Sequence, residues 1–136
     1  QEIMKVIDNY QAEVIILAGY MRILSADFIS KYFGKILNIH PSLLPKFPGL
    51  NTHQRAIDAF EKKHGASVHF VTEELDGGPV IAQEFVNIDS TDNAQTLAKK
   101  VLDKEHALYP KTIHWYTQGR LKLIDKNTAT LDKKTL

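Results

Sequence analysis

The sequence predicts an α/β domain built around a doubly wound, mostly parallel β-sheet. Two apolar runs, residues 14–19 and 35–39, are rich in β-branched and aliphatic residues, which is typical of strands buried on both faces of a parallel sheet. A short helix-like segment separates them, so together they form a βαβ unit, and such crossovers are right-handed. The chain has 136 residues, enough for one domain with its own core, and we predict a single domain over residues 1–136.

Four segments carry apolar residues at helical spacing. They are residues 1–10, 26–33, 53 to about 63, and a long stretch from about 92 that Pro110 is expected to kink or break before it resumes over 111–118. The predicted N-caps are Ser25, Thr52, and Ser90 or Thr91. Gly34, Gly65 and Gly119 are expected to end helices, and Phe60 is expected on the buried side of its helix.

Two more strands are predicted over residues 66–72 and 80–88, joined by a loop rich in acidic residues and glycine. Residues 121–124 and 129–131 suggest a terminal hairpin across the turn 125–127. Between the strand at 35–39 and the helix that follows it lies a loop, residues 41–50, with three prolines. Their fixed φ angles make this loop stiff, so it loses little entropy when held against a ligand.

Composition excludes several classes of protein. Apolar residues make up 43% and charged residues 24%, with a net charge of +1, which argues against disorder and against a basic nucleic-acid surface. The chain contains no cysteine, so disulfides and thiolate catalysis are excluded and a cytoplasmic location is favoured. We find no apolar run of membrane-spanning length and no signal peptide, and we therefore expect neither a membrane nor a nucleic-acid partner.

His40 and Asp76 are the most informative pair of residues. Each lies where a strand-like segment gives way to a turn rich in proline or glycine, the place where rigid scaffolds present catalytic side chains. If the two meet in space, the carboxylate orients the imidazole and favours its charged form, as a general acid toward an oxyanion requires. Asn38 lies two residues before His40 on the same strand face, so its amide is placed to hold that oxyanion.

Structural roles are the alternative for each of these residues. A strand-end Asn and His can simply cap the following turn, and an Asp-Gly-Gly sequence often completes only its own turn. His69 alternates with apolar residues in a strand and is a further candidate for the same cleft. The remaining histidines are His53, His64, His106 and His114. Their spacing is not that of metal ligands, so we predict no metal site.

Several segments together resemble a known family. They are Leu-Ala-Gly-Tyr-Met-Arg-Ile-Leu at 17–24, Asn-Ile-His-Pro-Ser-Leu-Leu-Pro at 38–45, Phe-Pro-Gly-Leu at 47–50, Glu-Leu-Asp-Gly-Gly-Pro-Val at 74–80 and Glu-His-Ala-Leu-Tyr-Pro at 105–110. Over nearly its whole length the chain resembles the phosphoribosylglycinamide formyltransferases, enzymes of purine synthesis that use 10-formyltetrahydrofolate. The resemblance implies a Rossmann-like fold of the formyltransferase type and formyl transfer to the amine of glycinamide ribonucleotide.

The resemblance also implies roles for individual residues. Asn38 and His40 would stabilise a tetrahedral oxyanion while Asp76 holds His40 charged, and no acyl-enzyme is needed. The folate would contact Met21, Arg22, Ile23, Leu24, Asn38, Thr72, Glu73, Glu74, Leu75 and Asp76. Pro41 and Glu105 would contact the ribonucleotide, and no metal takes part.

One departure from the family pattern affects the expected activity. Members begin with a strand and a glycine-rich phosphate loop at a helix N-terminus, and this sequence has neither, so it matches roughly the C-terminal two-thirds of the fold. An exposed parallel edge would favour association into homo-oligomers.

Two alternative functions stay open: a formyltetrahydrofolate deformylase, which uses water as nucleophile, and an inactive folate-binding fragment. A methionyl-tRNA formyltransferase is disfavoured, because no basic C-terminal domain follows.

Overall fold

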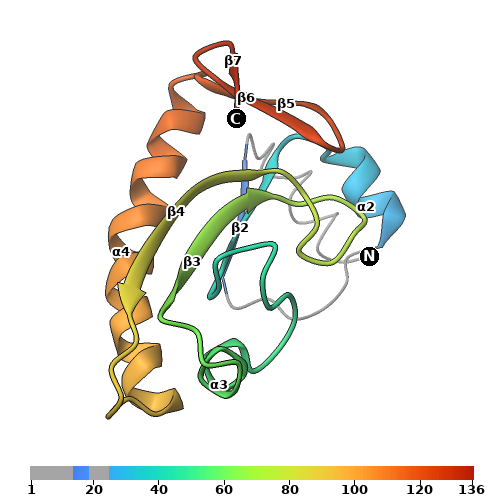
Figure 1. The fold of residues 1–136 in the computed structure, drawn as a ribbon. Helices are drawn as coiled ribbons and strands as arrows, with labels where there is room; N and C mark the ends of the chain where they lie inside the picture. Colours follow the sequence, from blue (N-terminus) through green and yellow to red (C-terminus); the bar gives the residue numbers. More distant parts are fainter. Residues whose placement is uncertain (1–13, 19–24) are drawn as a thin grey trace.

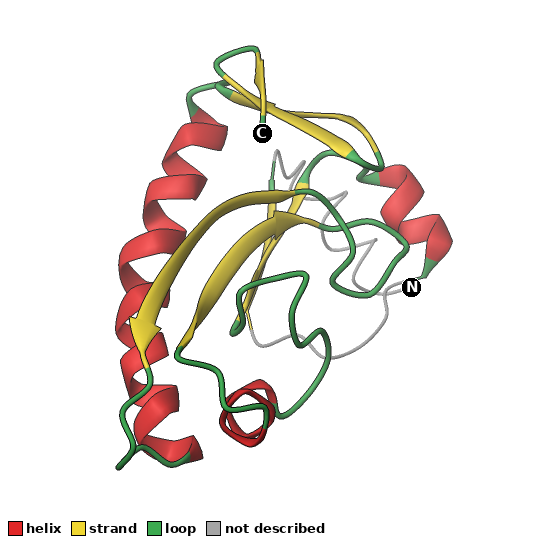
Figure 2. Ribbon diagram, in the orientation of Figure 1, coloured by secondary structure: helices red, strands yellow, loops and turns green. Residues whose placement is uncertain are grey.

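The computed structural model describes residues 14–18 and 25–136, and it confirms the α/β class (Figures 1 and 2). The main sheet contains, in spatial order, β1 (Ile15–Ala18), β2 (Ile36–His40), β3 (Lys63–Phe70) and β4 (Val80–Asn87). β1 and β2 are parallel and are joined through α2 (Ala26–Lys31), as the predicted βαβ unit requires. Ile16 of β1 is 41% exposed, so the expected burial of this strand on both faces does not hold there.

The described part of the sheet is mixed. β3 is antiparallel to β2, and β4 is antiparallel to β3. The predicted parallel arrangement is thus seen, among the described strands, in the β1–β2 pair. The connection between β3 and β4 is the short segment 71–79, which is too short for the crossover that parallel neighbours need.

The core lies between one face of the sheet and the long helix α4 (Ala94–Thr117), which runs along the sheet in Figure 1. Side chains of β2 and β3 alternate between the two faces, so every second residue points toward α4. The buried apolar residues of this core include Leu37, Ile39, Val68 and Phe70 from the strands and Leu97, Val101 and Leu108 from the helix.

The other face of β2 and β3 is polar although it is buried. The antiparallel register places Asn38 opposite His69 and His40 opposite Ser67, and all four side chains are at most 6% exposed. Four buried polar side chains on one sheet face need partners, because an unpaired buried polar group costs about 1–3 kcal/mol. This face is therefore where the candidate functional site forms.

The helix predicted over 53 to about 63 is shorter and begins differently. α3 spans Thr52–Asp58, its N-cap is Asn51, and the Thr52 hydroxyl instead donates to the Pro41 carbonyl at 2.5 Å. Residues 63–65 belong to β3, so Gly65 does not end the helix. The helix stops early because the chain turns left-handed directly after it.

That turn is a Schellman motif at the C-terminus of α3. The Phe60 N–H donates to the Ile57 carbonyl and the Glu61 N–H to the Ala56 carbonyl, while Phe60 adopts a φ of 56°. Phe60 is 90% exposed, so the prediction that it is buried was wrong. The motif points the side chain outward, against the expectation from its hydrophobicity.

The long helix α4 differs from the prediction at two places. Its N-cap is Asn93, which forms a capping box with Thr96, rather than Ser90 or Thr91. The helix also continues through Pro110. Proline removes the hydrogen bond to the carbonyl of residue 106, and both residues are exposed, so water can take the place of the missing N–H.

The predicted C-terminal hairpin is confirmed and has a third strand. β5 (Leu121–Asp125), β6 (Thr128–Leu131) and β7 (Lys134–Thr135) form a separate antiparallel sheet. The predicted helix over 1–10 lies outside the described residues. Within the described part of the chain, no helix is both long and apolar enough to cross a membrane.

Replacing Phe60 with glycine should stabilise the protein. A bulky residue at φ 56° costs about 1 kcal/mol relative to glycine, and Phe60 buries almost nothing in return. We expect Phe60→Gly to raise the free energy of unfolding by about that amount in urea titrations, whereas Phe60→Ala should change it little, because alanine keeps the strain. The reciprocal control is Gly119→Phe: α4 ends in the same motif with Gly119 at φ 74°, so this change should destabilise. Equal stabilities for the Phe60→Gly and Phe60→Ala proteins would contradict the strain argument.

Candidate functional site

His40 and Asp76 meet at the end of β2. The His40 Nδ1 atom lies 3.5 Å from Asp76 Oδ2, and both side chains are at most 8% exposed. Asp76 adopts a left-handed φ of 52°, which aspartate tolerates better than most residues. The structure therefore brings together the two residues, 36 positions apart, whose pairing the sequence suggested.

The proline-rich loop closes over this pair and contacts both members. The His40 Nε2–H donates to the Phe47 carbonyl at 2.9 Å, and the Gly49 N–H donates to Asp76 Oδ2 at 2.8 Å. The carboxylate thus accepts from a backbone group 27 residues away, instead of only completing its own turn. The other ring nitrogen of His40, Nδ1, faces the carboxylate.

His69, which the sequence suggested only as a further candidate for the same cleft, is a third member of the cluster. Its Nε2 atom lies 3.7 Å from Asp76 Oδ1 and 3.2 Å from Asn38 Nδ2, and its Nδ1–H donates to the Phe70 carbonyl at 3.0 Å. The pKa of His69 is lowered, chiefly by burial. The Phe70 carbonyl and Asp76 oppose this shift, and His40 adds to it. A neutral His69 with its proton on Nδ1 is the tautomer that accepts from the Asn38 amide. The signal in the sequence was its alternation with Val68 and Phe70.

Asn38 carries an unused acceptor. Its Nδ2 atom is paired with His69, while Oδ1 is buried and, among the described residues, has no hydrogen-bond partner. A buried orphan of this kind is costly and is characteristic of sites that receive a ligand. The Oδ1 atom is therefore placed to accept an N–H or O–H from a bound molecule.

The other predicted site residues are placed less closely together. The Pro41 carbonyl is occupied by the Thr52 hydroxyl, and Leu75 is 47% exposed. Glu105 is half-buried on α4, and burial raises its pKa, with His106 opposing. No contact recorded among the described residues joins Glu105 to the His40 cluster. Met21, Arg22, Ile23 and Leu24 lie outside the described part of the chain.

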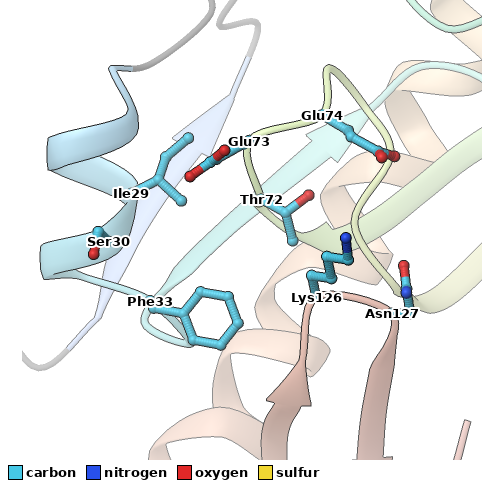
Figure 3. Close-up of a pocket in the computed structure, with 8 residues that line it drawn as sticks. All are labelled: Ile29, Ser30, Phe33, Thr72, Glu73, Glu74, Lys126 and Asn127. Carbon is cyan, nitrogen blue, oxygen red and sulfur yellow. The ribbon is translucent and has the colours of Figure 1, made fainter.

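Three predicted folate-contacting residues line a pocket of about 340 Å³ (Figure 3). Thr72, Glu73 and Glu74 form one wall, between α2 and the turn of the C-terminal hairpin. The remaining lining residues are Ile29 and Ser30 of α2, Phe33 directly after this helix, and Lys126 and Asn127 of the hairpin turn. The volume is within the range of small-molecule sites, and the wall belongs to the same loop as Asp76.

A second pair of histidines lies beside the loop. His53 Nδ1 and His64 Nε2 are 3.1 Å apart, and His64 packs edge-on against Phe47. Burial lowers the pKa of His64 to about 4, and the neighbouring His53 and His40 lower it further, with Glu61 opposing. Burial also lowers the pKa of His53. Both rings are therefore neutral at neutral pH and share one proton in their hydrogen bond. In the described part of the chain, no group of three or more His, Asp or Glu side chains is placed to hold a metal ion.

Fold and site together define an α/β protein with a buried amide, imidazole and carboxylate at the end of a sheet strand. Such a site can stabilise charge on a carbonyl oxygen, and nothing in the cluster resembles an activated nucleophile. A family model described as formyl transferase matches residues 1–113, and the chain belongs to this family.

The chain is similar to several known proteins. It is 51% identical over 136 residues to a phosphoribosylglycinamide formyltransferase of Escherichia coli (strain K12), covering all of this chain and 64% of that protein. A phosphoribosylglycinamide formyltransferase structure from Coxiella burnetii superposes with a TM-score of 0.93 at 47% identity, over 99% of this chain and 63% of the other. A formyltetrahydrofolate deformylase structure from Pseudomonas syringae superposes with a TM-score of 0.88 at 31% identity, over 96% of this chain and 43% of the other. The chain thus spans less than two-thirds of the length of these relatives.

Acid should destabilise the protein through His64. Its folded pKa of about 4 lies below the ordinary value of 6.5, so the folded state binds fewer protons than the unfolded state between these values. The stabilisation is fully present above pH 6.5 and is lost as the pH falls toward 4, by up to about 3 kcal/mol. Urea titrations across this range should show the loss. The slope should weaken in His64→Gln, which cannot titrate, and stay unchanged in His106→Gln on the exposed face of α4. An unchanged slope in His64→Gln would assign the acid sensitivity to other groups.

Proposed function

We propose that the protein transfers a formyl group from 10-formyltetrahydrofolate to the amine of glycinamide ribonucleotide, through a tetrahedral oxyanion, in de novo purine synthesis. The observation that carries the proposal is the buried cluster of Asn38, His40 and Asp76, in which the Asn38 Oδ1 atom has no partner among the described residues. The named activities of the relatives agree with it.

The reaction needs no covalent bond to the protein. The amine nitrogen forms a bond to the formyl carbon, and the carbonyl electrons move onto the oxygen. The bond from that carbon to the folate nitrogen then breaks, the folate nitrogen gains a proton and the former amine loses one. His40 supplies positive charge near the oxyanion, Asp76 balances that charge, and Asn38 offers an amide N–H to the oxygen. Asn38 Oδ1 is positioned to accept an N–H of the attacking amine.

The geometry limits how His40 acts. Its Nε2–H is held by the Phe47 carbonyl and its Nδ1 faces Asp76, so in this arrangement both ring nitrogens are engaged by the protein. His40 therefore stabilises the oxyanion as a fixed positive charge. Donating a proton directly would require one of these two contacts to open first.

For the co-substrates, we assign the folate to Met21–Leu24, Asn38 and the segment Thr72–Asp76. The pocket beside Thr72–Glu74 supports this assignment, because it opens next to the loop that carries Asp76. Glu105 and Pro41 are assigned to the ribonucleotide. Location in the cytoplasm and association into homo-oligomers complete the proposal.

Hydrolysis of the same donor is the second candidate, favoured by the likeness to the deformylase structure. Formate release measured with and without the amine acceptor separates the two: release without acceptor supports hydrolysis. Folate binding without catalysis is the third candidate function. Calorimetry with a folate analogue and with the nucleotide tests it, because binding of both argues against a folate-only fragment.

Removing the His40 imidazole should abolish most of the transfer. We expect His40→Ala in the purified protein to lower kcat by about 10²- to 10⁴-fold, because both charge stabilisation and orientation are lost. Production of formylated nucleotide is the measurement, and His106→Ala is the matched control, since His106 lies exposed on α4. Full activity of His40→Ala would refute the proposed mechanism.

Filling the pocket should weaken folate binding. Ser30 is an exposed residue of α2 on the pocket wall, so Ser30→Trp places an indole in the cavity without disturbing the core. We expect the Kd for a folate analogue to rise at least about tenfold, a loss of about 1.4 kcal/mol. Lys31→Trp, one position along the same helix and outside the pocket lining, is the control. Unchanged affinity in Ser30→Trp would place the folate elsewhere.

A further inference from the structure

The guanidinium of Arg55, on α3, binds the segment 47–50 at two points. Its Nη1 atom donates to the Pro48 carbonyl at 2.6 Å and to the Leu50 carbonyl at 3.0 Å. The guanidinium carbon also lies 5.5 Å from the centroid of the Phe47 ring. One half-buried side chain therefore holds both the backbone and the aromatic ring of this segment.

The same segment makes the two backbone contacts to the candidate catalytic pair. The Phe47 carbonyl accepts from His40, and the Gly49 N–H donates to Asp76. The two carbonyls bound by Arg55 belong to the residues immediately before and after Gly49. A shift of the segment would thus move the acceptor for one catalytic residue and the donor for the other together.

The backbone of this segment does not hold its shape by itself. Phe47 and Gly49 adopt left-handed φ values of 53° and 83°, and Asn51, directly after the segment, adopts a φ of 55°. For residues other than glycine such conformations cost about 1–2 kcal/mol each, and they persist only where surrounding contacts enforce them. Hydrogen bonds from a charged donor are the stronger kind, so Arg55 provides such enforcement.

The preceding part of the loop is held by other residues. The Ser67 hydroxyl donates to the Ser42 carbonyl and accepts from the Leu44 N–H, and Gln83 donates to the Leu44 carbonyl. Loss of Arg55 should therefore release residues 47–50 while residues 42–44 remain anchored to β3 and β4.

We propose that Arg55 is a positioning residue: it fixes the segment 47–50 so that the Phe47 carbonyl holds the His40 Nε2 proton and the Gly49 N–H keeps Asp76 facing His40 Nδ1. This role rests on the proposed formyl transfer. A lysine ammonium could donate to these carbonyls from its single nitrogen, but it cannot stack on the Phe47 ring as the planar guanidinium does, because it is a compact charge.

The test compares Arg55→Met, which keeps an apolar stem, with Arg55→Lys. In Arg55→Met we expect kcat to fall about 10- to 100-fold because the catalytic groups lose their alignment, while KM for the formyl donor stays within about threefold. Histidine-detected NMR should show the His40 Nε2–H as a slowly exchanging proton in the parent and exchanging at least about tenfold faster in Arg55→Met. For Arg55→Lys, both kcat and the exchange rate of the His40 proton should lie between the values of the parent and of Arg55→Met. Arg120→Met, which removes a guanidinium paired with Asp132 on the C-terminal hairpin, is the control and should match the parent.

Two results would overturn the proposal. One is an unchanged kcat and unchanged His40 proton exchange in Arg55→Met. The other is a loss of kcat that only matches the loss of folded protein seen by circular dichroism. If Arg55→Met does not fold, Arg55→Lys carries the same comparison. If the parent transfers no formyl group, the proposed function fails, whereas the His40 proton exchange still decides whether Arg55 positions the loop.

Discussion

The contact between the Asp76 carboxylate and the His40 imidazole is the interaction on which the candidate site depends. Three segments must converge to form it: the end of β2, the turn after β3, and the loop 47–50. Gly78 makes the approach of the turn possible, because a Cβ atom there would lie 1.8 Å from the Phe70 carbonyl oxygen. The same closeness brings the other oxygen of Asp76 toward His69.

The alternation of β2 and β3 lets one pair of strands serve both stability and the site. One face packs against α4, and the other presents four buried polar residues. Tyr109 of α4 connects these functions, since its hydroxyl contacts the carbonyls of Leu17 and Leu37, near the ends of β1 and β2. Burial raises the pKa of Tyr109, so the hydroxyl keeps its proton and remains a donor. The core helix thereby fixes the strand that carries Asn38 and His40.

Local patterns in the sequence predicted the strands, α2 with its Ser25 cap, the hairpin, and the meeting of His40 with Asp76. They failed where a tertiary or backbone effect decides the outcome. The end of α3 depends on a left-handed Phe60, which hydrophobicity alone places inside the protein. The antiparallel course of β3 depends on pairing between distant segments, which buried-strand patterns do not encode. The sequence named His69 only as a further candidate without a role, because that role arises from its position opposite Asn38, and cross-strand register is not visible in one strand.

The two histidines of the cluster, His40 and His69, share one carboxylate partner. Both face the single Asp76 carboxylate, and two imidazolium ions around one carboxylate would repel each other. Burial lowers the pKa of His69, so its ring is neutral at neutral pH, and the Phe70 carbonyl fixes its tautomer. That tautomer accepts from Asn38 Nδ2, which in turn fixes the orientation of the amide and leaves Oδ1 as the atom without a partner in the described part of the chain. The acceptor that stays open in the cluster is therefore determined by the neutral His69, while the His40 imidazole lies against the other oxygen of Asp76.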